Sequence, residues 1–129
     1  MEIVCHVEVH LWKVFMDGAT GALGAGARIV IITPERIRVE HSFRLGFKAS
    51  SNEVEYKALL IGLRAILNLG DREVEAYSDS RLVVNQVQGI FEAKDPRMIE
   101  YLRLVKQITN QFQKVKVVQS KGRINMLTL

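Results

Sequence analysis

Three short apolar runs occupy the N-terminal third of the chain, and they predict the strands Trp12–Met16, Ala27–Thr33 and Ile37–Leu45. Asp17-Gly18 closes the first run, and the small residues from Ala19 to Gly26 predict a tight connection after it. Pro34-Glu35-Arg36 separates the second run from the third and predicts a hairpin turn. The first three strands are therefore expected to form an antiparallel meander.

The remaining two thirds of the chain predict three helices and two strands. The longest helix is expected from Glu53 to Leu69, with Ser51-Asn52 as N-cap candidates and Gly70 as its stop. The elements expected after it are a strand Glu73–Tyr77, a helix Arg81–Gln88, a helix opened by Asp95-Pro96 that runs to about Gln113, and a strand Val115–Gln119. This order predicts one α/β domain of the α+β type, with helices packed on a mixed sheet.

One glutamate of the long predicted helix departs from the helix's polar face. That face is defined by polar residues at intervals of three or four, namely Glu53, Lys57, Arg64 and Asn68. Glu55 lies about 200° around the helix from Glu53. It therefore falls on the apolar side, where a carboxylate is costly unless it is paired, protonated or bound to a cation. The helix dipole in the first turn is an alternative source of stabilisation.

Two further acids follow predicted strands. Asp17 precedes Gly18 and fits an ordinary Asp-Gly turn, whereas Asp79 precedes a helix and fits an N-cap, although Ser78 and Ser80 could each serve as that cap. Together with Glu55, these acids form a candidate cluster for a hard divalent cation bound through oxygen. Two such cations about 4 Å apart support phosphodiester hydrolysis.

Composition and charge narrow the class of protein. The 129 residues suffice for one domain with a core, and the single cysteine, Cys5, excludes an intramolecular disulfide and fits a reducing compartment. No apolar run reaches the ~18 residues of a membrane helix, so we expect an intracellular protein, cytoplasmic or nuclear. The net charge is +4, and the segment from Lys94 to Leu129 has eight bases against two acids. That excess fits either contact with phosphates or a solvated helix face.

Several strings in order resemble the type 1 ribonuclease H domain of plant Gypsy-class LTR retrotransposon polyproteins. They are WKVFMDGA, SSNEVEYKALLIGLRA, VEAYSDSRLVVNQVQG, FEAKDPRMIEYLRLVKQ and FQKVKVVQ. The resemblance divides the chain into a leader, 1–11, without an assigned function, a ribonuclease H-like domain, 12–119, and an aberrant tail, 120–129. It implies a five-stranded mixed sheet in the order 3-2-1-4-5.

The resemblance also implies an activity and a set of site residues. The activity is endonucleolytic cleavage of the RNA strand of RNA–DNA hybrids with two Mg²⁺ ions, for which Mn²⁺ is a substitute. Asp17, Glu55 and Asp79 match the family's metal-binding catalytic acids. The positions expected to contact nucleic acid are Gly18, Asn52 and Ser80. A monomer is expected, with reverse transcriptase and integrase domains as partners in a parent polyprotein and no membrane partner.

The C-terminal segment departs from the family pattern, because no Asp or Glu follows Glu100 and the family's fourth acid stands in a helix after the last strand. We expect that helix to be missing and activity to be weak or lost, with a catalytically inactive nucleic-acid-binding remnant, or an unstable fragment, as the alternatives. The codons of Asn125–Leu129 can be chosen so that another frame reads His-Ala-Asp-Ser, the missing motif. A frameshift just upstream of Asn125 is therefore a hypothesis, which a codon other than CTG for Leu127 would contradict.

Overall fold

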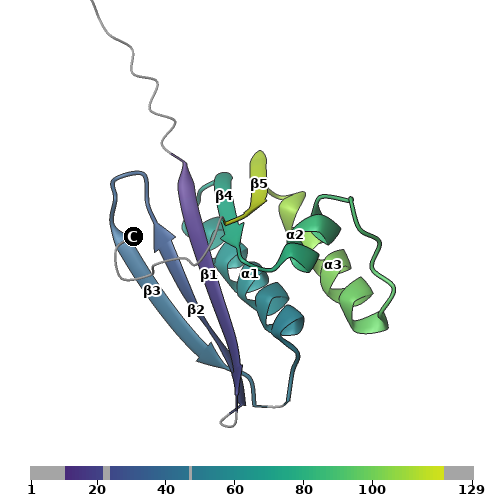
Figure 1. Ribbon diagram of the computed structural model, residues 1–129. Helices are drawn as coiled ribbons and strands as arrows, with labels where there is room; N and C mark the ends of the chain where they lie inside the picture. Colours follow the sequence, from purple (N-terminus) through teal and green to yellow (C-terminus); the bar gives the residue numbers. More distant parts are fainter. Residues whose placement is uncertain (1–10, 22–23, 47, 121–129) are drawn as a thin grey trace, which may run out of the picture.

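One mixed five-stranded sheet organises the molecule, in the order β3-β2-β1-β4-β5 (Figure 1). The computed structural model describes residues 11–21, 24–46 and 48–120. Most of the predicted leader, 1–11, and of the predicted tail, 120–129, lies outside these residues. The strands are β1 (Trp12–Gly21), β2 (Gly24–Ile32), β3 (Arg38–Arg44), β4 (Glu73–Ser78) and β5 (Lys114–Gln119). β1 pairs antiparallel with β2 and parallel with β4, so the predicted mixed sheet and its order are confirmed.

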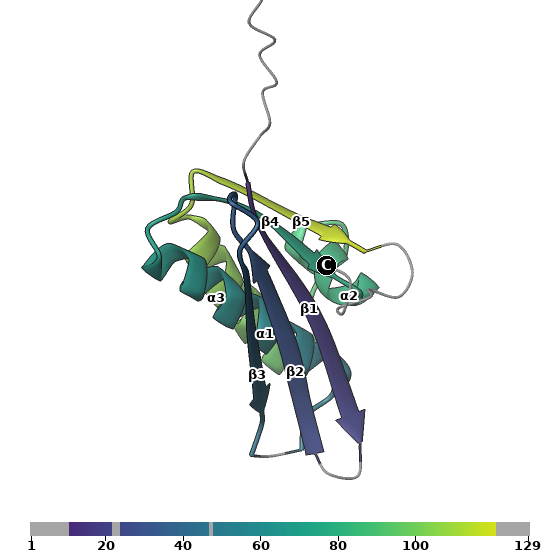
Figure 2. The same ribbon diagram turned by 90° about the vertical axis from the view of Figure 1, so that its left-hand side faces the viewer.

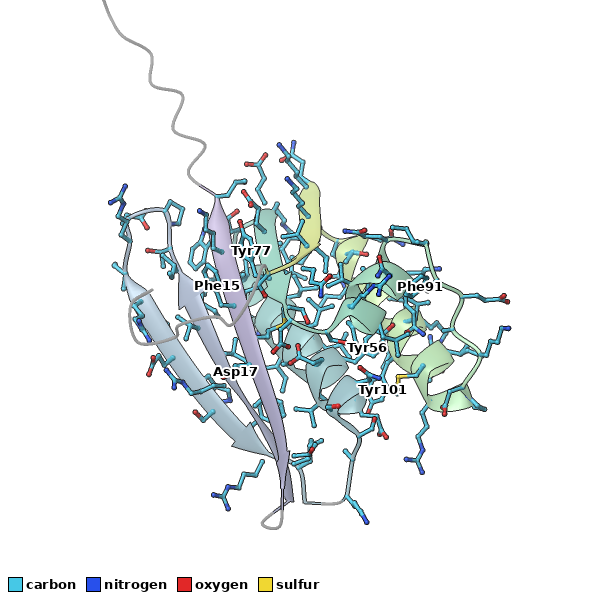
Figure 3. All side chains as sticks on the ribbon, viewed as in Figure 1. Phe15, Asp17, Tyr56, Tyr77, Phe91 and Tyr101 are labelled. Carbon is cyan, nitrogen blue, oxygen red and sulfur yellow. The ribbon has the colours of Figure 1, made fainter. Side chains whose placement is uncertain are left out.

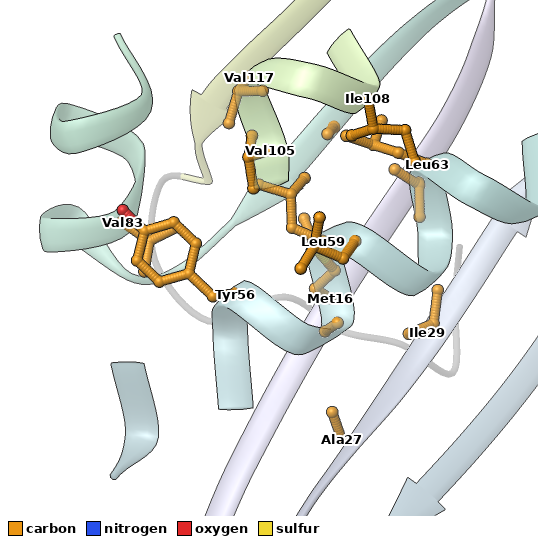
Figure 4. Packing of buried hydrophobic residues seen from close by; sticks show 14 of the residues in the cluster. Met16, Ala27, Ile29, Tyr56, Leu59, Leu63, Val83, Val105, Ile108 and Val117 are labelled. Carbon is orange, nitrogen blue, oxygen red and sulfur yellow. The ribbon is translucent and has the colours of Figure 1, made fainter. Parts of the chain in front are cut away.

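The helices gather on one side of the sheet (Figure 2). They are α1 (Ser51–Asn68), α2 (Arg81–Val87) and α3 (Pro96–Thr109). α1 contacts β1, β2 and β4, and α3 packs against α1. Buried residues of all three helices belong to one core cluster, with Tyr56, Leu59 and Leu63 of α1 at its centre (Figure 4).

The first strand is longer than the pattern predicts. β1 continues through Gly21, and β2 starts at Gly24 instead of Ala27, so the small residues 19–21 and 24–26 are paired strand and not a connection. Glycine and alanine are weak strand formers, but a continuous ladder with a neighbour overrides that preference. Asp17 consequently lies inside β1, opposite Arg28, and the Asp-Gly turn expected there is wrong.

The start of α1 also differs from the prediction. Its N-cap is Ser50, neither Ser51 nor Asn52, and the Ser50 hydroxyl accepts a hydrogen bond from the Glu53 amide in a capping box. Glu53, expected on the solvent face, is buried and pairs with Arg97 of α3, 3.2 Å away. The pairing explains the burial, because a partner compensates the carboxylate for lost water. Gly70, with a φ of 90°, follows the helix as expected.

The central helix lies so close to the sheet that one position of α1 has no free space for a side chain. A Cβ on Gly62 would stand 2.7 Å from Cγ2 of Val14, which is itself fully buried in β1. The Gly62 position therefore sets the distance between α1 and β1.

Gly62→Ala should lower the free energy of unfolding, although alanine normally favours a helix over glycine by about 1 kcal/mol. Overpacking in a dense core typically costs about 1–3 kcal/mol, and Val14 is fully buried. Gly46→Ala is the control, since a Cβ there meets nothing within 4 Å. Denaturant unfolding measures both variants, and a Gly62→Ala protein as stable as the control would contradict the packing argument.

Candidate active site

Glu55 is the buried centre of the candidate site. Its side chain is 3% exposed, one turn before Leu59 on the inner face of α1, as the periodicity predicts. Oε1 accepts a hydrogen bond from the backbone amide of Gly18, at 3.0 Å, and Oε2 accepts one from the Ser78 hydroxyl, at 2.7 Å. The carboxylate therefore ties α1 to β1 at the residue after Asp17 and to β4 at the residue before Asp79.

The two serines beside Asp79 continue this network. The Ser80 amide donates to the Ser78 hydroxyl, at 3.1 Å, and the Ser80 hydroxyl donates to Oδ1 of Asn52, at 3.0 Å. The Ser80 hydroxyl also accepts from the Val83 amide and is the N-cap of α2. Asp79 was one of the candidates for the N-cap of α2, but Ser80 fills that position. The Asp79 side chain is exposed.

The two aspartates emerge at corresponding points of neighbouring parallel strands. The register of β1 with β4 ends at Phe15 and Tyr77, whose rings stack with centroids 4.8 Å apart. Asp17 and Asp79 each follow two residues later. Figure 3 shows Asp17 on β1, further along the strand than Phe15, which stacks on Tyr77. Glu55 reaches Gly18 and Ser78, the residues next to these aspartates, and of the two aspartates it is Asp79 whose carboxylate acts on Glu55.

Burial and a neighbouring acid change the protonation of Glu55. Loss of water raises the pKa of Glu55 from its ordinary value of 4.5 to about 7, and the Asp79 carboxylate raises it as well. The Ser78 hydroxyl and the Gly18 amide oppose this rise, because both donate to the charged form. The site thus holds excess negative charge that a cation would compensate.

The oxygen atoms of the three acids are the candidate ligands for Mg²⁺. Within residues 11–21, 24–46 and 48–120, no group of three or more His, Cys, Asp or Glu side chains is arranged so that it could hold a metal ion. Mg²⁺ does not require one, since proteins commonly bind it through one or two carboxylates together with water and substrate phosphate. The oxygen donors of Glu55 and Asp79, with Asp17 on the adjoining strand, fit that mode of binding.

Two features of the site were missed by reasoning from the sequence. The orienting role of Ser78 was not assigned, although the Ser-Asp-Ser string places a hydroxyl on either side of the acid. Gly18 was assigned only to nucleic-acid contact, whereas its amide already donates to Glu55. A Cβ at Gly18 would lie 2.9 Å from Oε1 of Glu55, so the absence of a side chain permits that approach.

The raised pKa of Glu55 predicts a pH-dependent stability. Between pH 4.5 and 7 the folded chain binds this proton more tightly than the unfolded chain does, so the stabilisation from Glu55 is complete below 4.5 and is lost as the pH rises to about 7. In EDTA, the free energy of unfolding should fall across this window by up to about 3 kcal/mol relative to Glu55→Gln. The exposed Glu92→Gln is the control, and parallel curves for wild type and Glu55→Gln would contradict the assignment.

Solved structures share this architecture. Ribonuclease H1 from Halobacterium salinarum superposes with a TM-score of 0.78 at 24% identity, covering 86% of each chain. LC11-RNase H1, solved in complex with an RNA/DNA hybrid, gives 0.76 at 26% identity and also covers 86% of each chain. The sheet order, the helices on it and the similarity to these structures define this chain as a ribonuclease H-like domain.

The sequence comparisons place this domain in a family. The family model described as "Reverse transcriptase-like" matches residues 15–123, and the chain belongs to that family. The bifunctional protein Rv2228c of Mycobacterium tuberculosis is 29% identical over 98 residues, which are 76% of this chain and 27% of that protein. Ribonuclease HI of Halobacterium salinarum is 37% identical over 49 residues, 38% of this chain and 25% of that protein. The chain thus spans about a quarter of the length of the curated relatives it matches.

The sequence predicts that the chain has no membrane-spanning helix. Across the part of the chain that the structure describes, no helix is long and apolar enough to cross a membrane.

Proposed function

We propose that this domain is a metal-dependent ribonuclease H that cleaves the RNA strand of RNA–DNA hybrids endonucleolytically. The observation that carries the proposal is the buried carboxylate of Glu55, held between Gly18 and Ser78 beside Asp79 and Asp17 in a ribonuclease H fold. The solved LC11-RNase H1 complex, in which a related fold holds an RNA/DNA hybrid, supports the substrate class.

The three acids have a common task in this proposal and differ in how they are held. Glu55, Asp79 and Asp17 would hold Mg²⁺, or Mn²⁺ in its place, and the bound cations would activate water and neutralise charge on the phosphodiester. Glu55 is fixed by its two hydrogen bonds, so its oxygens are oriented before a cation arrives. Asp17 and Asp79 are exposed, and the substrate can therefore approach them from solvent.

Asn52 and Ser80 are placed to orient the nucleic-acid backbone. The Ser80 hydroxyl donates to Oδ1 of Asn52. The Nδ2 group of the Asn52 side-chain amide is therefore left as a donor without an acceptor among the described residues. A phosphate or a 2′-hydroxyl oxygen is a suitable acceptor for it. The Gly18 amide is already donated to Glu55, so a backbone contact there would have to share that donor.

We further propose that the domain derives from a plant Gypsy-class polyprotein in which reverse transcriptase and integrase accompany it. The motif strings support this origin. A foamy virus protease-reverse transcriptase shares the fold, with a TM-score of 0.68 at 17% identity over 18% of that chain. The residues after Gln119 differ from the family pattern, in which an acid stands after the last strand, and we propose on this ground that cleavage is slow.

A labelled RNA–DNA hybrid tests the activity. Slow, metal-dependent cutting of the RNA strand is expected in Mg²⁺ or Mn²⁺, and EDTA should abolish it. Asp17→Asn should reduce it by more than the roughly 10- to 100-fold that loss of an outer partner of a metal ligand costs. Gel electrophoresis of the RNA products measures the rates. Cutting that persists in EDTA or in Asp17→Asn would refute the proposed site.

A second candidate function is hybrid binding without cleavage, which the lack of acids after Glu100 favours. Binding in a shift assay, with intact RNA after prolonged incubation in Mn²⁺, would establish this function in place of the first.

Ser78→Ala tests whether the hydroxyl positions Glu55. Loss of this outer hydrogen bond should reduce cleavage by about 10- to 100-fold and raise the Mg²⁺ concentration needed for half-maximal rate. Ser51→Ala, at the exposed start of α1, is the control. A Ser78→Ala protein with an unchanged rate and Mg²⁺ requirement would show that the hydrogen bond has no part in the site.

A further inference from the structure

A groove lies on the face of the sheet away from α1, next to Asp17. It has a volume of about 540 Å³ and is lined by Asp17, Gly24, Ala25, Gly26, Ala27, Arg28, Ser42, Phe43 and Arg44. We call it the Gly26 groove, because glycine leaves its floor without a side chain. A Cβ on Gly26 would lie 2.7 Å from the Phe43 carbonyl oxygen, so a side chain at this position would clash with the backbone of β3.

The register explains why polar side chains meet in this groove. Arg28 is the cross-strand partner of Asp17 on one side and of Ser42 on the other, and Gly26 is the partner of Arg44. Cross-strand partners project from the same face of a sheet. The neighbouring Ala25 and Ala27 point the other way, into the core. Two arginines and a serine therefore line the groove beside the first acid of the site.

Arg28 is anchored by an ion pair with Glu40. Its Nη2 donates to Oε1 of Glu40, at 3.2 Å, and Arg38 binds the same carboxylate. Two guanidinium groups thus share one carboxylate. The Nε of Arg28 is buried and has no acceptor in the part of the chain that the structure describes, so this donor of the guanidinium is unsatisfied.

We propose that the Gly26 groove binds a backbone phosphate of the nucleic acid, with Arg28 and Arg44 as the phosphate ligands. Arginine presents several donors in one plane and suits phosphate oxygens. Arg44 is exposed on the last residue of β3, and the Ser42 hydroxyl adds another donor between the two arginines. The groove adjoins Asp17, so a phosphate there would hold the strand beside the acids. This inference rests on the proposed function for its ligand class.

The test is binding of a fluorescent RNA–DNA hybrid in EDTA, followed by anisotropy over a range of salt concentrations. Arg28→Ala and Arg44→Ala should each weaken binding about three- to tenfold at low salt and reduce the salt slope by about 1, the signature of one lost phosphate contact. Arg64→Ala removes the same charge from the exposed side of α1 and is the matched control. Circular dichroism checks that each variant is folded.

Glu40→Gln separates a phosphate ligand from a structural ion pair. If Arg28 binds phosphate, removing the Glu40 charge should leave hybrid binding as tight as in the wild type or tighter. If Arg28 only braces β2 against β3, Glu40→Gln should weaken binding as much as Arg28→Ala does, and the proposal is overturned. The same holds if Arg28→Ala and Arg44→Ala behave like Arg64→Ala.

The cleavage assay keeps this result distinct from the proposed function. A wild-type chain that cuts the hybrid while the arginine variants bind normally would refute the groove alone. A chain that binds through the groove without cutting would refute the nuclease activity alone.

Discussion

The carboxylate of Glu55 is the interaction on which the site depends. It is buried at the point where α1 meets β1 and β4, and its two oxygens are held by a backbone amide and a serine hydroxyl. A buried carboxylate is tolerated when hydrogen bonds or a cation compensate it, and here the hydrogen bonds alone leave the pKa near 7. Burial of the carboxylate therefore costs stability at neutral pH, and under the proposed function a divalent cation would offset that cost.

Close packing makes that contact possible. Gly18 lets the Glu55 side chain approach β1, and Gly62 lets α1 approach Val14. Two glycines, one on β1 and one on α1, thus permit the close packing of these two elements. The serines around Asp79 then link the start of α2 to the same carboxylate. Ser80 caps α2 and also fixes Asn52, which joins the predicted backbone-contact residues to the acids. The site is thus a single hydrogen-bonded unit built from four elements.

The face of the sheet away from α1 adds a second kind of chemistry. The acids at the end of the β1–β4 pairing favour cations, whereas Arg28 and Arg44 across β2 and β3 favour phosphate. The proposed function would require both, because a purely acidic surface repels a nucleic acid. Arg28 stands directly opposite Asp17 in the register, so the two side chains project from the same face of the sheet.

The sequence alone determined the order of the elements, the sheet order through family resemblance, and the anomaly at Glu55, since helical periodicity placed that residue on the inner face. It could not give the full length of β1, because glycine and alanine resemble a loop until a partner strand pairs with them. Nor could it show that Glu53 is buried against Arg97, or that Ser78 and Gly18 hold Glu55. These contacts join residues far apart in the chain, and periodicity reports which face a side chain occupies, not what it meets there. Only the tertiary structure decided them.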